Sequence, residues 1–175
     1  MTTTLFTNAH IATGEPGSTA ASTLPLQDIL VTDGVFTAFG PGLAQQYEAQ
    51  GGDPAAIEVV DLGGKLVCPP FCDTHLHLDY VFTARKPGAV NESGTLFEGI
   101  QRWSETKSDL TVDEIKQRAK IGIKKEMLHG VQLIRSHADV TDPNLTSLKA
   151  LLELKEELKD TVTLQIVSFP QEGMY

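Results

Sequence analysis

Between residues 71 and 169, apolar runs of strand length alternate with segments of helical periodicity, and this alternation constrains the fold more than any other feature. Strand-like runs rich in β-branched and aromatic residues occupy residues 71–80, 131–140 and 162–169. Parallel strands need a long crossover connection, which a helix between the strands supplies. The alternation therefore predicts an α/β structure with a parallel sheet.

The expected helices carry their own start and stop signals. One helix is predicted from Thr95 to about Lys107. Residues Thr111–Glu114 form a capping box, and the apolar face that follows should end near Gly130, which favours the left-handed conformation of a helix end. Asp142 and Pro143 are expected to open the next helix, with the aspartate as N-cap and the proline at the first helical position.

The first part of the chain indicates short strands separated by loops. Asp33-Gly34 lies between two apolar runs and is a strong hairpin signal. Gly63-Gly64 suggests a second hairpin, while Ala12–Pro25 and Gln45–Pro54 are polar and Gly-rich and are expected to be loops. These features predict a small β domain, or part of one, in residues 1–66.

Composition excludes several classes of function. The formal net charge is −9, which argues against a nucleic-acid partner because phosphate contacts need clustered basic residues. No secretory signal or membrane-spanning run is visible. Cys68 and Cys72 would lie roughly 13 Å apart on an extended segment, too far to form a disulfide, and no second pair of ligands completes a metal site with them. A reduced, cytoplasmic protein is expected.

The residues His75-Leu76-His77 carry the clearest chemistry. On a strand, side chains alternate between faces, so both imidazoles should lie on one face a few ångströms apart while Leu76 points away. Two neutral imidazoles that converge in this way suit a first-row divalent metal. The alternative is a pair of polar residues on the solvated face of an edge strand.

The sequence around this pair resembles the amidohydrolase superfamily, in which a β-sandwich domain leads into the first strand of a TIM-like barrel. The resemblance begins at Asp61–Val67 and continues through Pro69–Asp79, where the family's His-x-His pair ends strand one. Segments Ser93–Trp103, Arg135–Val140 and Leu164–Gly173 are similar to the cytosine deaminase branch. In the first 60 residues the likeness is only architectural.

The resemblance assigns roles to four residues. His75 and His77 match the first two ligands of one divalent metal ion, iron or zinc. Gln171 matches a glutamine whose amide reads the pyrimidine ring, and Leu96 matches a position whose backbone meets a ring N–H. The alternatives are a polar loop residue for Gln171 and helix packing for Leu96. His137 has a family counterpart, for which a satisfied core histidine and a group that orients a metal ligand both stay open.

Two aspartates lie close to the histidine pair in sequence. Asp73 and Asp79 share the histidine face by spacing. Asp73 is expected to be structural. Asp79 is expected to touch the pocket or the loop after the first strand of the barrel.

The resemblance also implies the fold class and the reaction. Residues 1–66 are expected to be part of a small β-sandwich domain, and residues 67–175 the first three βα units of an incomplete TIM-like (β/α)8 barrel. The implied activity of the intact parent is metal-dependent hydrolytic deamination of a cyclic amidine or nucleobase, such as cytosine to uracil and ammonia. In the family, the catalytic Glu and the remaining metal ligands follow later, so no catalytic acid or base is expected here. The chain alone is expected to be inactive.

Several alternatives remain open at this point. The ring could be creatinine, isoguanine or an aminotriazine, since each contains a cyclic N–C=N unit. A cyclic amide hydrolase of the dihydroorotase sort is a second option, against which the motif at Gln171 argues. The third is a non-catalytic fragment that binds a partner through an exposed barrel edge. The expected partner of the intact enzyme is a small molecule, and a homo-oligomer remains an option.

Overall fold

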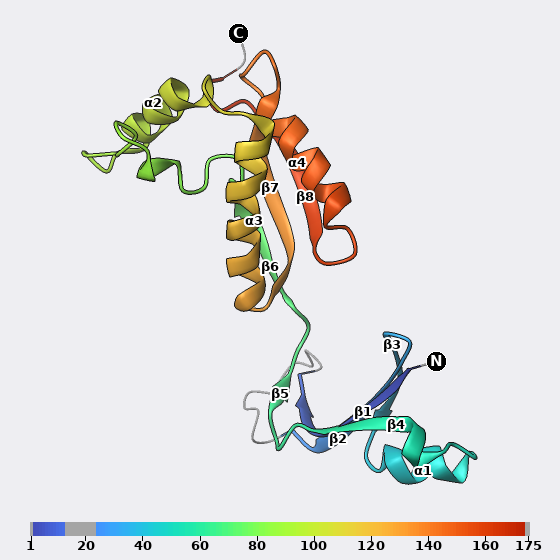
Figure 1. Ribbon diagram of the computed structural model, residues 1–175. Coiled ribbons are helices and arrows are strands. Elements are labelled where there is room, and N and C mark those ends of the chain that lie inside the picture. The colour runs from blue at the N-terminus through green and yellow to red at the C-terminus, as the bar shows by residue number, and fades with distance from the viewer. Residues whose placement is uncertain (1, 13–23, 174–175) are drawn as a thin grey trace. The chain divides into compact units, whose positions relative to one another are not determined.

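The computed structural model describes residues 2–12 and 24–173, which fall into two compact units, Met1–Pro69 and Pro70–Tyr175 (Figure 1). Most of the loop expected at Ala12–Pro25 lies outside the described residues. The elements of the first unit are β1 (Thr3–Ile11), β2 (Leu26–Thr32), β3 (Val35–Gly40), α1 (Leu43–Ala49), η2 (Pro54–Ala56), β4 (Ile57–Asp61) and β5 (Leu66–Val67). Those of the second are β6 (Phe71–Leu76), η3 (Thr83–Arg85), α2 (Leu96–Lys107), α3 (Val112–Leu128), β7 (Val131–Asp139), α4 (Thr146–Glu157) and β8 (Thr163–Phe169).

The first unit contains a sheet with the strand order β3-β2-β1-β4, and β5 also pairs with β1. β2 and β3 form the predicted hairpin, whose turn residues Asp33 and Gly34 both have positive φ, 49° and 78°. Leu5 and Ala9 of β1 are fully buried, and Ile29 of β2 is buried with them. The described strands form this one sheet, and its assignment to a β-sandwich domain stays a prediction.

The prediction of a second hairpin at Gly63-Gly64 is wrong. β4 and β5 do not pair with each other, because both run parallel to β1. The two glycines instead carry the chain past an irregularity in β1, where Asn8 has a φ of 58° and its carbonyl accepts a hydrogen bond from the Gly64 N–H (2.8 Å). Both glycines have positive φ, a conformation that glycine adopts readily and that hairpin turns also use, so the same residues fit either structure.

The prediction of a loop from Gln45 to Pro54 is also wrong in part. α1 occupies Leu43–Ala49, although it has no side-chain N-cap and no acidic residue in its first turn. Leu43 is buried, and its N–H donates to the carboxylate of Asp28 (3.1 Å). A tertiary contact therefore stabilises a helix for which local sequence signals are weak.

The second unit has the predicted α/β architecture. Its parallel sheet has the order β6-β7-β8, with α2 and α3 between the first two strands and α4 between the last two. α3 and α4 lie side by side along the sheet (Figure 1). Their buried side chains form one core with the strands, consisting of Leu78, Ala119, Ile123, Val131, Ile134, Ala138, Leu151, Leu154, Val162 and Leu164. The expected fold class, a β unit followed by parallel βα units of the amidohydrolase type, is confirmed.

The helix starts agree with the sequence in two cases out of three. Thr95 caps α2 and Thr111 caps α3, each by accepting a hydrogen bond from the backbone N–H three residues later. α4 begins at Thr146, later than predicted, with Leu145 in the left-handed conformation at its N-cap. Asp142 instead accepts hydrogen bonds from the N–H groups of Asn144 and Thr146 (2.9 Å each), so it closes the turn before the helix.

Two further expectations concern the whole chain. Cys68 and Cys72 are both exposed free thiols. Within residues 2–12 and 24–173, no helix is long and apolar enough to cross a membrane.

Candidate active site

The two histidines singled out by the sequence lie at the C-terminal end of β6. His75 belongs to the strand and His77 follows its last residue, Leu76. The two imidazole centroids are 5.2 Å apart, and Leu76 packs against the hydrophobic core of the second unit. The rings are thus brought together on one side of the chain, as strand alternation predicts.

A third imidazole, from the neighbouring strand, joins this pair. The ring of His137 on β7 stacks on His75 with centroids 4.1 Å apart, and its centroid lies 5.6 Å from that of His77. Its Nδ1 is buried and has no hydrogen-bond partner in the described part of the chain. Both roles predicted for His137, a satisfied core histidine and a group that orients a metal ligand, stay predictions.

The surroundings of His77 and His137 favour the uncharged form of these two rings. Burial lowers the pKa of His77, and the positive charges that His75 and His137 would carry lower it further. Burial and His75 likewise lower the pKa of His137. The neutral imidazole is the form that binds a metal, because its free lone pair is then available.

Tyr80 connects the histidines with a pocket. Its ring stacks on His77 with centroids 4.7 Å apart, and it also contacts the indole of Trp103, with centroids 4.9 Å apart. Phe169, the last residue of β8, meets His77 edge-on at 5.3 Å. A continuous series of aromatic rings therefore runs from the histidines to Trp103 in α2.

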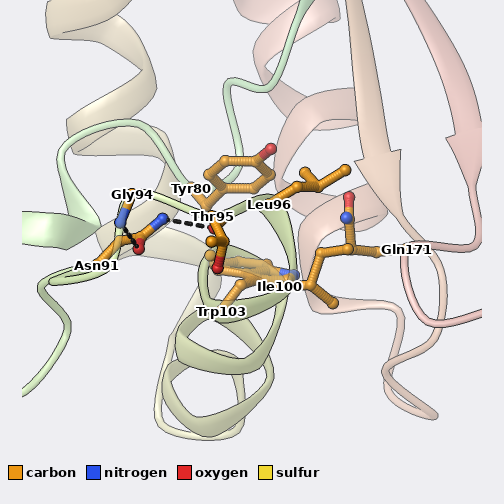
Figure 2. Close-up of a pocket in the computed structure, with 9 residues that line it drawn as sticks. Tyr80, Asn91, Gly94, Thr95, Leu96, Ile100, Trp103 and Gln171 are labelled. Carbon is orange, nitrogen blue, oxygen red and sulfur yellow. Dashed lines mark hydrogen bonds between the residues drawn. The ribbon is translucent and has the colours of Figure 1, made fainter.

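The pocket has a volume of about 340 Å³, and both residues predicted to read a substrate ring lie on it. Leu96 contributes from the first turn of α2 and Gln171 from the loop after β8 (Figure 2). Tyr80 and Trp103 form aromatic parts of the same wall. The other lining residues are Asn91, Gly94, Thr95, Gly99 and Ile100.

The loop before α2 is held by its own side chains. Asn91 donates to the Thr95 carbonyl (2.8 Å) and accepts from the Gly94 N–H (2.9 Å). Glu98 accepts hydrogen bonds from the N–H groups of Ser93 (2.6 Å) and Glu92 (3.1 Å). These bonds shape one side of the pocket without help from distant elements.

The two nearby aspartates have structural partners. Asp73 accepts a hydrogen bond from the His75 N–H (2.9 Å). Asp79 is completely buried, and it accepts from the N–H groups of Tyr80 (3.1 Å) and Asp139 (2.9 Å). It therefore touches the loop after β6, one of its two predicted positions, and it does not line the pocket. Burial raises the pKa of Asp79 to about 6.

Sequence reasoning missed Tyr80 and Trp103 as pocket residues, together with the polar groups behind them. The Trp103 indole donates to a carboxylate oxygen of Asp139 (2.6 Å), a buried residue at the end of β7. Tyr80 directly follows the segment that ends at Asp79, and Trp103 ends the motif that begins at Ser93. Their places in these motifs were the available signal.

Comparison with known proteins decides the family. A match to the amidohydrolase family covers residues 58–174. The chain belongs to that family. This amidohydrolase chain is 35% identical over 120 residues to N-isopropylammelide isopropyl amidohydrolase from Pseudomonas sp. (strain ADP), a match that covers 66% of the chain and 30% of the relative. It is 28% identical over 152 residues to pterin deaminase from Rhizobium rhizogenes, covering 84% and 32% respectively.

Solved structures give the same grouping. 5-Methylcytosine deaminase from Klebsiella pneumoniae, liganded with 5-fluorocytosine, aligns with a TM-score of 0.77 and 36% identity. That alignment covers 97% of this amidohydrolase chain and 37% of the deaminase. N-isopropylammelide isopropylaminohydrolase from Burkholderia multivorans aligns with a TM-score of 0.72 and 26% identity, covering 99% and 39%. The chain thus spans about a third of the length of its relatives.

Proposed function

We propose that this chain is the part of a metal-dependent deaminase that binds the metal with two histidines and recognises a cyclic amidine or nucleobase such as cytosine. The observation that carries the proposal is the shared pocket of Leu96 and Gln171, whose wall includes Tyr80, the residue stacked on His77. Relatives named as deaminases of 5-methylcytosine and of pterin support a ring of this class.

The metal is proposed to be one divalent ion, iron or zinc, held by His75 and His77. The donor set fits, because the two rings are adjacent and the pKa of His77 is lowered toward the neutral ligand form. Within the described ranges, no group of three or more His, Cys, Asp or Glu side chains could hold a metal. The proposal assigns only His75 and His77 of this chain to the metal, and no catalytic acid or base. The bound ion would supply Lewis acidity and an activated water.

Ring recognition is proposed to use three kinds of contact. The Gln171 amide can donate to a ring nitrogen or carbonyl oxygen, both of which are acceptors in cytosine. The backbone of Leu96 would meet a ring N–H. Tyr80 and Trp103 offer flat aromatic surfaces against which a planar ring can pack. A pocket of about 340 Å³ suits a small ligand.

A second candidate is hydrolysis of an amino-substituted triazine. The N-isopropylammelide hydrolase from Pseudomonas, at 35% identity, favours this option. The same Gln171 and Leu96 would then contact a triazine ring, and the leaving group would be an alkylamine in place of ammonia. Creatinine and isoguanine belong to the same chemical class. The proposed partner in every case is a small molecule, and the proposed location is the cytoplasm.

The test is a product assay on the longest natural protein that carries this sequence, loaded with zinc or iron. Cytosine, 5-methylcytosine, pterin, isoguanine, creatinine and N-isopropylammelide are supplied separately, and ammonia and isopropylamine are measured. The proposal predicts ammonia from a nucleobase. Isopropylamine from N-isopropylammelide alone would favour the second candidate, and no hydrolysis of any ring compound by the metal-loaded protein would refute both.

A further inference from the structure

Lys107, the last residue of α2, joins that helix to two other segments. Its ammonium donates to Asp139 (3.2 Å) at the end of β7 and to the Thr141 hydroxyl (2.6 Å) just beyond it. It also forms a close ion pair with Glu172 in the loop after β8. The Lys107 side chain is only 12% exposed and that of Asp139 only 2%. Solvent therefore screens this cluster much less than a surface pair.

The charges in the cluster are well compensated. Burial alone would lower the pKa of Lys107, but the bonds to Glu172 and Asp139 outweigh it and raise the pKa. Burial would raise the pKa of Asp139, but hydrogen bonds from Thr141 and Trp103 and the nearby ammonium lower it. A buried ammonium with two carboxylate partners holds its position, because loss of a partner would leave an unpaired charge.

Each of the two carboxylates is linked to a different residue of the pocket wall. Asp139 accepts from the indole of Trp103, so one of its oxygens serves both the pocket wall and Lys107. Glu172 directly follows Gln171, whose side chain faces the pocket in Figure 2. The turn that carries both is closed by the Gly173 N–H, which donates to the Pro170 carbonyl (3.0 Å).

α2 carries Leu96 at its start, Trp103 within it and Lys107 at its end. The helix and the loop after β8 come from distant parts of the sequence, and the ion pair between Lys107 and Glu172 ties them together. We infer that Lys107 is a positioning residue that sets the separation between Gln171 and the Leu96 and Trp103 side of the pocket, and thereby the ring that is accepted. This inference rests on the proposed ring-binding function.

The test compares Lys107→Met, which removes the charge and keeps most of the stem, with Lys107→Arg, which keeps the charge. Lys116→Met is the matched control, because the Lys116 side chain is 14% exposed and also pairs with two carboxylates, Glu153 and Glu157. Lys116 does not line the pocket. All variants are made in the metal-loaded natural protein and assayed on the ring substrate found in the product assay.

Lys107→Met is expected to raise KM about tenfold with kcat changed less than about threefold, because a displaced recognition group weakens binding of the ring. Lys107→Arg should restore most of the loss, and Lys116→Met should leave KM unchanged. Combined with Gln171→Ala, Lys107→Met should add little to the effect of Gln171→Ala alone, since both act through one contact. The positioning role would be overturned if the KM increases of Lys107→Met and Gln171→Ala were additive in the double variant. An equal KM increase in Lys116→Met would overturn it as well.

A second readout needs no substrate. The side-chain amide resonance of isotope-labelled Gln171 should shift or broaden in Lys107→Met and in the milder Glu172→Gln, but not in Lys116→Met. If this resonance responds while no ring compound is hydrolysed, the proposed function fails and the positioning of Gln171 stands. If ring substrates are hydrolysed and both the resonance and KM are unchanged, the role of Lys107 is wrong.

Discussion

The ring of Tyr80 stacks on the imidazole of His77, with centroids 4.7 Å apart and planes inclined by 28°. This contact joins the end of β6 to the pocket that Leu96 and Gln171 share. Because Tyr80 contacts one proposed metal ligand and also lines the proposed ring site, we expect it to set the distance between a bound ring and the metal.

The stacking contact itself leads to the first prediction. Tyr80→Ala removes a ring that lies between His77 and Trp103, so KM should rise about tenfold or more through lost aromatic packing. Burial raises the pKa of Tyr80 to about 12, so its hydroxyl stays protonated at neutral pH. Tyr80→Phe should therefore keep KM within about threefold. Equal effects of the two substitutions, measured by steady-state kinetics, would argue for the hydroxyl and against stacking.

Metal content provides the second prediction. His75→Ala and His77→Ala should each lower the metal-to-protein ratio after dialysis, because a site that loses one of its imidazole donors binds first-row metals more weakly. His129→Ala serves as the control, because His129 is exposed at the end of α3 and is not a proposed ligand. Elemental analysis of the three variants gives the answer. Unchanged metal in His75→Ala and His77→Ala would place the ion elsewhere.

Gln171 is the subject of the third prediction. Gln171→Ala should weaken ring recognition by about 1–3 kcal/mol, because the buried acceptors of the ring lose a donor. Metal content should stay the same. Steady-state kinetics and elemental analysis on one preparation measure both quantities. Turnover equal to that of the unmodified protein would show that Gln171 is a structural loop residue and does not recognise the ring.

The fourth prediction concerns the pH dependence of stability. Hydrogen bonds from Ser93 and from the Glu92 N–H lower the pKa of Glu98 to about 2. A carboxylate with a depressed folded-state pKa stabilises the fold fully above its unfolded pKa of about 4.3, and this contribution is lost as the pH falls toward about 2. Glu98→Gln should thus lower the urea midpoint at pH 7, with the difference shrinking below about pH 4.

The matched control for that experiment is Glu105→Gln. Glu105 pairs with the same Arg102 but accepts no bond from the loop before α2. It should change the urea midpoint less than Glu98→Gln at pH 7. A constant difference between Glu98→Gln and the unmodified protein from pH 7 to about pH 2.5 would contradict the proposed role of the loop bonds.

Local signals predicted those parts of the fold whose causes are local. The capping box of Thr111 and Glu114 marks the start of α3, and Asp33-Gly34 marks the turn between β2 and β3. At Asp142 the same logic failed, because an aspartate can close a turn before a helix as well as cap the helix itself. α1 was missed because its stability depends on the burial of Leu43, which no nearby residue signals.

In the candidate site, too, some residues were predictable from the sequence and others were not. The spacing of His75 and His77 was enough to place both rings together, and motif resemblance placed Leu96 and Gln171. The contacts of Lys107 could not be predicted, because its partners lie 32 and 65 residues away in sequence. Only the pairing of β6, β7 and β8 brings those segments together.

The proposed metal and ring sites can be seen together in a crystal structure of the metal-loaded natural protein with the ring product bound, using anomalous scattering to locate the ion. We expect one metal peak within about 2.0–2.1 Å of a nitrogen of both His75 and His77. We also expect the ring in the pocket beside Tyr80, within hydrogen-bond distance of Gln171. A metal peak away from these two histidines, or a ring bound outside this pocket, would contradict the proposed function.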